Sequence, residues 1–247
     1  MPTNPLHLGL ILDYFYAHTQ IRDYDLEAEN IRRLVEETQP GARRLLDVGC
    51  ATGEHALRLK AFYQVDGIDL DPELVELACQ KNPEGRFEVA DMRTFELGRQ
   101  YDVVLCLSST IGYARTLEEL ASTLKCLRRC LAPGGVVLVE PWFPPDVWKP
   151  GKVNSFTAET ANQKVVRMTL GGLTQTAEGA PLSTLEFFWL VGTEQGIFER
   201  RELHELGLFT VEQMKNAFLR AGLSVEFEPE GAVGWGVYVA RNRDEGR

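Results

Sequence analysis

The residues best suited to chemistry lie between Asp47 and Gly53, in the segment DVGCATG, which follows an apolar run and precedes a helical pattern. Small residues such as Gly49 and Ala51 let a ligand approach the backbone, and the free N–H groups at a helix start attract polar ligand atoms. The segment indicates a turn that binds a nucleotide-like cofactor, with Asp47, Gly49, Cys50 and Ala51 around it. A tight turn without a ligand is the alternative.

The spacing within this turn separates two cofactor classes. A dinucleotide-binding turn carries glycine at its first, third and sixth positions, where this chain has Gly49, Ala51 and Glu54. A glutamate is unfavourable beside a pyrophosphate, whereas S-adenosylmethionine has no phosphate and carries a zwitterionic methionine end. The turn therefore favours S-adenosylmethionine, and a nicotinamide-dependent oxidoreductase of similar fold is the alternative it disfavours.

Acidic residues follow the next two predicted strands. Asp69, with Leu70 beside it, ends the second strand 20 residues after Gly49, where a carboxylate accepts hydrogen bonds from ribose hydroxyl groups. Asp91 and Met92 follow the third strand and are predicted to contact the amino group and the ring of an adenine. For Asp91 and Met92 the alternative is a surface acid beside a core methionine.

The fourth predicted strand ends at Leu107 and Ser108, which we also assign to the cofactor site. The alternative there is a turn that binds nothing. Together with the acids, these residues require several strand ends to meet at one place.

The elements that would bring them together alternate between strand and helix with short connections. Such alternation is typical of a doubly wound, mostly parallel sheet, here predicted with seven strands, whose carboxyl ends share one edge where ligands bind. The predicted strands are 45–48, 65–69, 87–90, 101–107 and 136–140, and the predicted helices are 25–38, 54–62 and those starting at Pro72 and Leu117.

The pattern changes after residue 142. A proline-rich segment interpreted as a linker precedes runs with period two at 165–170, 185–191 and 197–206, which predict antiparallel strands. A helix after Thr210 and a hairpin of 223–227 and 236–240 would complete the first sheet. Thr116–Glu119 and Thr210–Gln213 read as capping boxes. We therefore assign 1–149 and 207–247 to a cofactor-binding domain and 150–206 to an antiparallel insertion that covers the substrate.

Composition narrows the classes of partner. The net charge of −10 disfavours nucleic-acid binding, which depends on clustered Lys and Arg, and Glu27 interleaves with Arg32 on what reads as a solvated helix face. We found no apolar run long enough to span a membrane, so we expect no membrane partner. The five cysteines favour reduced thiols in the cytoplasm, and the four histidines lack the spacing of metal ligands. We expect a small-molecule substrate and no metal.

Three residues are candidate bases or positioning groups for the substrate: Tyr113, Tyr16 and His204. A tyrosine with an ordinary pKa near ~10 is mostly protonated at neutral pH, so Tyr113 is better suited to hydrogen bonding than to proton removal. His204 lies among charged residues of a predicted strand, which is more typical of a surface or interface histidine.

Three longer segments resemble the N,N-dimethyltransferases of nucleotide-linked amino sugars, a group of Rossmann-like S-adenosylmethionine-dependent methyltransferases. These segments are DMRTFELGRQYDVVLCLSSTIGY, LAPGGVVLVEPWFP and LFTVEQMKNAFLRAGLSVEF. The resemblance implies that Tyr24 covers the methionine end of the cofactor and binds its carboxylate. It also implies a cofactor pocket and an insertion that helps to form a homodimer. The residues implied to line that pocket are Gly49, Ala51, Asp69, Asp91, Met92 and Leu107.

The chain departs from this group at three positions. Tyr113 replaces a histidine, Trp235 replaces an arginine suited to a diphosphate, and Leu12 replaces a tyrosine. Methyl transfer to an amine nitrogen, including that of an amino sugar, is therefore the leading hypothesis. The alternatives are a methyltransferase for an oxygen or other small acceptor and a non-catalytic protein that binds S-adenosylmethionine.

Overall fold

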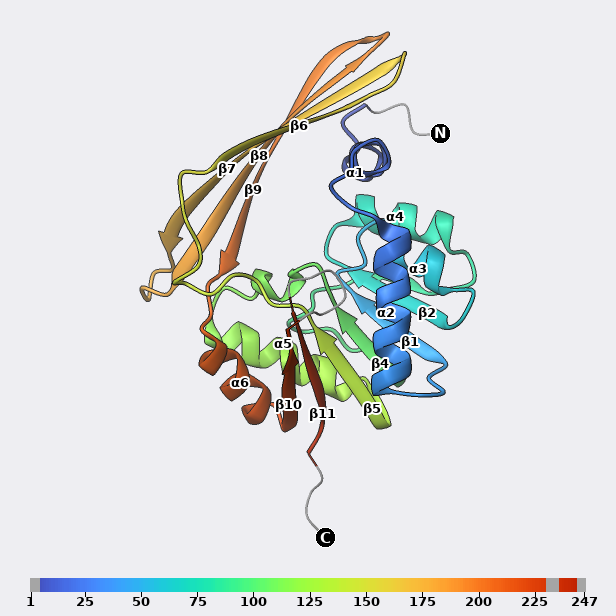
Figure 1. Ribbon diagram of the computed structural model, residues 1–247, viewed down its shortest axis with the longest axis vertical. Helices are drawn as coiled ribbons and strands as arrows, with labels where there is room; N and C mark the ends of the chain where they lie inside the picture. The colour runs from blue at the N-terminus through green and yellow to red at the C-terminus, as the bar shows by residue number, and fades with distance from the viewer. Residues whose placement is uncertain (1–4, 230–235, 244–247) are drawn as a thin grey trace.

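The computed structural model describes residues 5–229 and 236–243, which form two β-sheets. The larger sheet has seven strands in the order β10-β11-β5-β4-β1-β2-β3, and the smaller has four in the order β6-β7-β8-β9. Figure 1 shows the long strands of the smaller sheet arching over the edge of the larger layer. Trp235 lies outside the described residues, so its predicted role stays a prediction.

The larger sheet confirms the predicted doubly wound class. Five of its strands are parallel, and β10 and β11 form the antiparallel hairpin at one edge. Its strands are β1 (Arg44–Val48), β2 (Gln64–Asp69), β3 (Phe87–Val89), β4 (Tyr101–Cys106), β5 (Leu131–Val139), β10 (Leu223–Glu228) and β11 (Val237–Asn242). Its helices are α2 (Tyr24–Thr38), α3 (Glu54–Leu59), α4 (Pro72–Lys81), η1 (Thr110–Tyr113), α5 (Leu117–Arg129) and α6 (Val211–Arg220).

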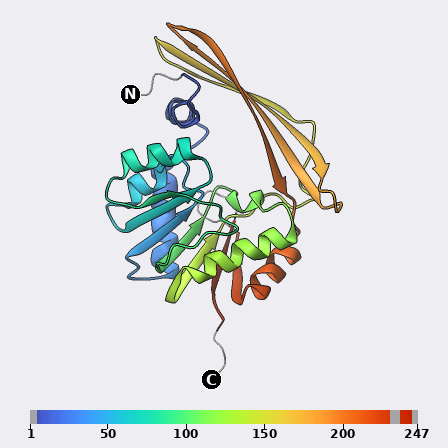
Figure 2. The ribbon, with the colours of Figure 1, turned by 180° about the vertical axis from the view of Figure 1, so that it is seen from behind.

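Two apolar cores hold the helices against this sheet. Ile31 of α2 and Leu59 of α3 pack on one face, and Leu124 of α5 and Phe218 of α6 pack on the other. Figure 2, seen from behind, shows α5 and α6 along that second face. Because both faces are covered, the central strands read as continuous apolar runs, such as that of β4.

The smaller sheet consists of β6 (Val153–Glu159), β7 (Gln163–Gln175), β8 (Pro181–Thr193) and β9 (Gly196–Gly207). All its pairings are antiparallel, and α1 (Leu8–Ala17) packs against β6 and β7 on one side and α4 on the other. Ile11 and Phe15 of α1 join Trp189 of β8 in a third apolar core. This core joins the smaller sheet to α1. A second contact with the larger domain is made by β9 and η1.

The structure corrects several predicted elements. The helix α1 and the strand β6 were not predicted, α3 ends at Leu59 rather than 62, and β5 begins at Leu131 rather than 136. Tyr101 pairs with Leu131 before a register shift, so the Pro-Gly-Gly segment is a bulge within the strand rather than a break before it. The capping box at Thr210 and Gln213 is confirmed. At Thr116 it is only half formed, because Glu119 accepts from the N–H of Arg115 instead.

Among residues 5–229 and 236–243, no helix is long and apolar enough to cross a membrane. The same residues contain no group of three or more histidine, cysteine or acidic side chains placed to hold a metal ion.

Candidate active site

The turn after β1 binds the end of β2 through backbone groups. The N–H groups of Gly49 and Cys50 both donate to the carbonyl of Ile68, at 2.8 and 3.0 Å. Gly49 has a φ of 79°, and a Cβ added there would lie 2.4 Å from Thr110 Cγ2. Glycine is required at this position because the backbone is left-handed and the segment after β4 packs directly on it.

Asp69 is held rigidly at the end of β2. Its Oδ2 accepts from the N–H of Ala51 at 2.9 Å, and its Oδ1 accepts from the N–H of Asp71 at 3.0 Å. Burial raises its pKa, although these hydrogen bonds act in the opposite direction. Each carboxylate oxygen keeps a second lone pair, so the group can still accept from ribose hydroxyls. Leu70 beside it is 64% exposed, which leaves an apolar surface open at this edge.

The turn after β4 is strained and fixed by β5. Ser108 and Ser109 have φ values of 52° and 62°, a conformation that costs non-glycine residues energy. The Ser108 N–H donates to Glu140 Oε2 at 2.6 Å, and Ser109 Oγ donates to the carbonyl of Pro141 at 2.8 Å. Two contacts from the end of β5 thus hold the turn against the preference of its backbone.

A half-buried ion-pair cluster lies beside the turn. Arg22 donates through Nε to Glu27 Oε1 at 3.1 Å and through Nη2 to Ser108 Oγ at 2.9 Å, and His55 Nε2 lies 2.9 Å from Glu27 Oε2. Burial would raise the pKa of Glu27, but hydrogen bonds from His55 and Arg22 outweigh it and lower that pKa to about 2. The predicted solvated role of Glu27 is therefore wrong, whereas the nearby Arg32 is exposed as predicted.

Tyr24 lies at the centre of this cluster. Arg22 sits 4.7 Å from the centre of its ring, and the rings of Tyr16 and His55 meet it edge-on at 6.2 and 5.5 Å. Burial raises the pKa of Tyr24, so its hydroxyl remains a hydrogen-bond donor at neutral pH. Its position is compatible with the predicted contact to a carboxylate.

The remaining predicted cofactor residues occupy the same edge with different environments. Asp47 and Leu107 are buried, and burial raises the pKa values of Asp47 and of the Cys50 thiol. Asp91 bonds to Arg93 through both oxygens, and those hydrogen bonds lower its pKa. A contact between Asp91 and an adenine amino group would therefore share the carboxylate with Arg93. Met92 packs partly buried against the core beside it.

Tyr113 and His204 meet although 91 residues separate them. Tyr113 Oη lies 2.6 Å from His204 Nδ1, and His204 Nε2 lies 3.8 Å from Glu202 Oε2. Burial and the nearby carboxylates of Asp69 and Glu202 raise the pKa of Tyr113. His204 is thus not an isolated surface residue but connects η1 to the inner face of β9. Tyr16, the third candidate, accepts from Arg167 Nη1 at 3.3 Å.

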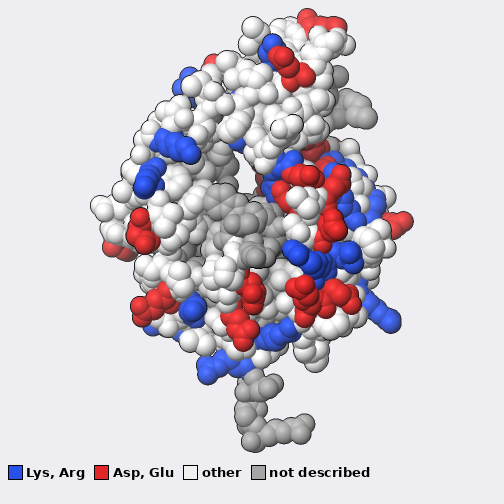
Figure 3. All heavy atoms as spheres, viewed as in Figure 1, with Lys and Arg blue, Asp and Glu red and all other residues white. Residues whose placement is uncertain are grey.

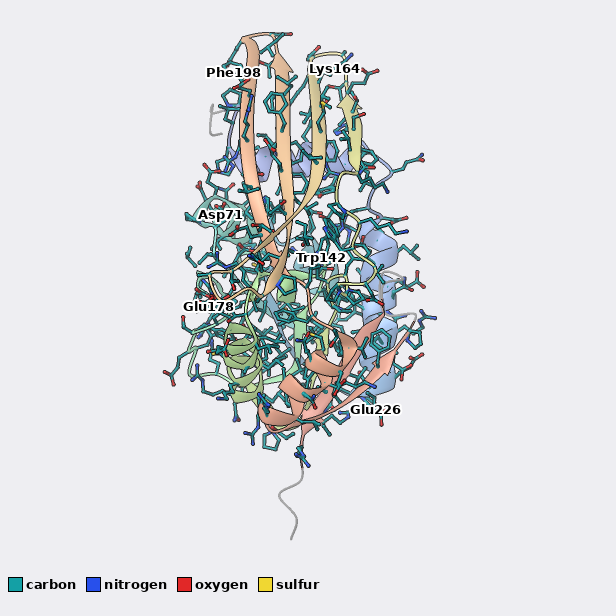
Figure 4. The ribbon with its side chains drawn as sticks, turned by 90° about the vertical axis from the view of Figure 1, so that its left-hand side faces the viewer. Asp71, Trp142, Lys164, Glu178, Phe198 and Glu226 are labelled. Carbon is teal, nitrogen blue, oxygen red and sulfur yellow. The ribbon has the colours of Figure 1, made fainter. Side chains whose placement is uncertain are left out.

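A pocket of about 370 Å³ lies along the smaller sheet, and Leu185, which lines it, is paired with His204 across β8 and β9. Its wall is aromatic: the rings of Trp142, Phe143 and Trp148 lie 4.8 to 5.8 Å from one another. Lys149 and Lys152 also line the pocket. The hydroxyl of Thr169 in its wall is buried and lacks a hydrogen-bond partner among the described residues. Figure 4 labels Trp142 at the junction of the long strands with the larger domain.

These pocket residues were missed by the sequence analysis, which interpreted 141–151 as a linker. The density of aromatic residues in PWFPPDVW was the available signal. Another hollow of about 450 Å³ lies beside Gln64 and Val65, where β2 begins. It is at the opposite edge of the sheet from Asp69 and Tyr113, so we assign it no role in the site.

Comparisons with known proteins agree with this geometry. Residues 45–135 match the family model described as a methyltransferase domain. The chain is 37% identical over 220 residues to dTDP-3-amino-3,6-dideoxy-alpha-D-glucopyranose N,N-dimethyltransferase of Streptomyces fradiae, covering 88% of this chain and 84% of that protein.

Two solved structures share the whole fold. Streptomyces venezuelae DesVI superposes with a TM-score of 0.86 at 30% identity, covering 95% of this chain and 98% of that one. CalS10, an amino pentose methyltransferase from Micromonospora echinaspora solved with S-adenosylmethionine bound, superposes with a TM-score of 0.81 at 30% identity. Coverage in that comparison is 94% of this chain and 97% of the other.

Proposed function

Because this chain belongs to the family of S-adenosylmethionine-dependent methyltransferases that contains the amino-sugar N,N-dimethyltransferases, we propose that it methylates the amine of a nucleotide-linked amino sugar. The observation that carries the substrate assignment is the position of the Tyr113–His204 pair. This pair lies between the edge that carries Asp69 and the aromatic pocket beside Trp142.

The residues at the edge suit S-adenosylmethionine. When bound, this cofactor supplies a methyl group on a positively charged sulfur, a strong leaving group. Asp69 would accept from the ribose, Asp91, Met92 and Leu70 would surround the adenine, and Tyr24 would contact the methionine carboxylate. Glu54 forms ion pairs with Lys81 and Arg58, so its negative charge is already neutralised. The argument against a dinucleotide cofactor therefore depends more on Ala51 than on Glu54.

Tyr113 and His204 would prepare the acceptor amine, which must be neutral to attack. With its pKa raised, Tyr113 stays protonated and can receive the amine proton at Oη only while passing its own proton to His204 Nδ1. This transfer requires the tautomer of His204 that carries its proton on Nε2, the atom nearest Glu202. In this interpretation Tyr113 stands where the related group has a histidine, and His204 supplies an imidazole beside it.

The aromatic pocket suits the nucleotide part of such a substrate. Trp142, Phe143 and Trp148 offer faces on which a base can stack, and Lys149 and Lys152 offer positive charge to a diphosphate. Figure 3 shows a hollow between the smaller sheet and the larger domain, with a dense group of charged side chains to its right.

Transfer of a labelled methyl group from S-adenosylmethionine tests this proposal. We expect product with a dTDP-linked amino sugar, and little with the same sugar lacking the nucleotide or with a hydroxyl in place of the amine. Lys152→Ala should raise KM for the nucleotide-linked substrate with kcat little changed. Equal rates with and without the nucleotide would overturn the substrate assignment and leave methyl transfer intact.

We also infer that two copies pair through the outer face of the smaller sheet. Val153, Met168, Leu170 and Leu203 are exposed there, and the register aligns Val153 with Leu170. Glu186 of β8 separates Leu170 from Leu203, so the apolar surface is centred on β6 and β7. Exposed apolar side chains grouped on a sheet are typical of an interface. Sedimentation equilibrium should give a dimer for the wild type and a monomer for Met168→Glu/Leu203→Glu, and a wild-type monomer would remove this inference.

A place in the cytoplasm and the absence of nucleic-acid partners remain predictions.

A further inference from the structure

The carboxylate of Glu202 lies on the inner face of the smaller sheet, two residues before His204 on β9. Because side chains alternate along a strand, Arg200, Glu202 and His204 share this face. Trp189 and Phe187 lie opposite Arg200 and Glu202 on the neighbouring strand β8. The side chain of Glu202 is only 15% exposed. A carboxylate enclosed to this degree needs partners from the protein itself.

Both oxygens of Glu202 are fixed by donors. Oε1 accepts from Arg200 Nε at 3.1 Å, and Oε2 accepts from Trp189 Nε1 at 3.2 Å. Trp189 is buried, and Arg200 Nη1 donates in turn to the carbonyl of Leu6 at 2.8 Å and to Glu73 Oε2 at 3.1 Å. Burial would raise the pKa of Glu202, but hydrogen bonds and the charge of Arg200 outweigh burial and lower that pKa. Glu202 is therefore an ionised carboxylate at neutral pH, and other parts of the fold set its orientation.

The oxygen that Trp189 holds is also the one nearest to His204. It lies 3.8 Å from His204 Nε2, which is an ion-pair distance and too long for a direct hydrogen bond. Nδ1 of the same imidazole lies 2.6 Å from Tyr113 Oη. The ring of Phe187 packs edge-on against the imidazole, with 4.9 Å between the ring centres. The imidazole therefore has a hydroxyl group at one nitrogen and a fixed negative charge near the other.

This arrangement favours one of the two neutral tautomers of His204. A proton on Nε2 is attracted by the negative oxygen of Glu202, whereas a lone pair on Nε2 is repelled by it. With the proton on Nε2, Nδ1 carries a lone pair and can accept the hydrogen bond of the Tyr113 hydroxyl. The same negative charge stabilises an imidazolium, which forms when Nδ1 takes up a proton.

We propose that Glu202 is a positioning residue for proton removal, which keeps the proton of neutral His204 on Nε2 and stabilises the imidazolium formed when Tyr113 passes its proton to Nδ1. The proposal deepens the proposed function and rests on the proton path given there. In this step the amine proton moves to Tyr113 Oη, the hydroxyl proton moves to His204 Nδ1, and Glu202 stays ionised. The side chain of His204 is 26% exposed, so the imidazolium can release one proton to water before the next transfer.

Glu202→Gln tests this assignment because an amide has one oxygen for the two donors, Arg200 and Trp189. The cation attracts that oxygen more strongly, so the amide N–H groups would face His204 Nε2. We expect nitrogen-15 NMR at pH 9 to show neutral His204 protonated at Nε2 in the wild type and at Nδ1 in Glu202→Gln. The chain has four histidines, and the signals that disappear in His204→Phe identify this one. Glu199→Gln, at an exposed position on the other face of β9, should keep the wild-type tautomer.

Steady-state kinetics separate a positioning role from a structural one. Glu202→Gln should lower kcat for the amino-sugar substrate about 10-fold, with the Kd of S-adenosylhomocysteine changed less than twofold. Because Glu202 would act only through Tyr113 and His204, Tyr113→Phe/Glu202→Gln should be no slower than Tyr113→Phe alone. A role confined to packing would make the two effects multiply.

Three results would overturn the assignment: a wild type whose neutral His204 is protonated at Nδ1, an unchanged tautomer in Glu202→Gln, or effects on kcat that multiply. If Glu202→Gln fails to fold, Glu202→Asp replaces it in the kinetic comparison. Its shorter carboxylate should lower kcat in the wild-type background but not in Tyr113→Phe, and equal losses in both backgrounds contradict the proposal. The NMR measurement needs no acceptor. The expected tautomers in a protein that methylates no amino sugar would therefore refute the acceptor proposal alone.

Discussion

The proposed cofactor edge of the larger sheet and the inner face of the smaller sheet each enclose an arginine, half-buried in the first and buried in the second, but in opposite ways. Arg22 bonds to Glu27 and Ser108. Arg167 is 9% exposed, bonds only to the hydroxyl of Tyr16 among the described residues, and lies within 6.0 Å of the centres of five aromatic rings. One cation is held by directional polar contacts and the other by apolar packing.

This difference matches the tasks that we propose for the two regions. A cofactor with a constant set of polar groups is best recognised by protein atoms whose positions are set before it binds. The hydrogen bonds around Arg22 hold such atoms in place at the cofactor edge. The smaller sheet shapes a pocket from aromatic faces, which determine size and stacking and tolerate changes in the acceptor.

Removing each arginine should separate the two modes most clearly. Arg22→Met leaves Glu27 with one partner fewer and is expected to lower the free energy of unfolding by about 4 kcal/mol. Arg167→Met leaves no carboxylate unpaired and fits its apolar surroundings, so the loss should be about 1 kcal/mol. Urea unfolding at pH 7 measures both. Equal losses of stability would show that an arginine paired with a carboxylate and an arginine surrounded by aromatic rings contribute alike.

The pH dependence of stability tests only the ion pairs of Glu27 with Arg22 and His55. The pKa of Glu27 is about 2, below the ordinary value of 4.5. A carboxyl whose pKa falls on folding stabilises fully above its unfolded pKa, and this contribution disappears as pH drops toward the folded value. The wild type should exceed Glu27→Gln by about 3 kcal/mol at pH 7, and the gap should close between pH 4.5 and 2.

Glu29→Gln, an exposed position of the same helix, is the matched control for that experiment. It should unfold like the wild type throughout the range. A gap between wild type and Glu27→Gln that stays constant with pH would mean that packing, not charge, makes Glu27 important.

Two glycines with the same backbone conformation isolate the packing of the cofactor turns. Gly41 and Gly49 have φ values of 78° and 79°, but only Gly49 has a neighbour, Thr110, within reach of an added Cβ. Gly41→Ala should cost about 1 kcal/mol of stability for its backbone alone, and Gly49→Ala should cost about 2 kcal/mol more because two turns must separate. Only Gly49→Ala should weaken S-adenosylhomocysteine binding, and parallel behaviour of the two would contradict this.

The smallest effect is expected on the substrate side. Tyr113→Phe should lower kcat about 10-fold, because His204 loses its hydrogen-bond partner and the amine proton its path, while the Kd of S-adenosylhomocysteine stays unchanged. Tyr14→Phe is the control, since that hydroxyl bonds to the backbone of Gln163, in the contact between α1 and the smaller sheet. Loss of affinity for S-adenosylhomocysteine in Tyr113→Phe would mean that Tyr113 belongs to the cofactor edge and not to the substrate side.

The cofactor edge was predictable because its residues follow directly after strands. Asp69 and Leu107 end apolar runs, and the parallel arrangement brings every such end to one edge, whatever the exact packing. The helix start at Asp71 and the glycine turn are local as well. Periodicity did not reveal α1, whose apolar residues occur almost without interruption, nor β6, whose mixed residues pair only with β7.

The sequence by itself determined the class of fold, the use of S-adenosylmethionine and the residues that follow the strands at the edge where we propose that it binds. Only the tertiary structure joined Tyr113 to His204, buried Glu27 against Arg22 and His55, and left one oxygen of Glu140 without a partner. These contacts join residues that are distant in the sequence or depend on what covers a side chain. Local spacing records which face a residue occupies, but not which charge or ring the rest of the chain places opposite it.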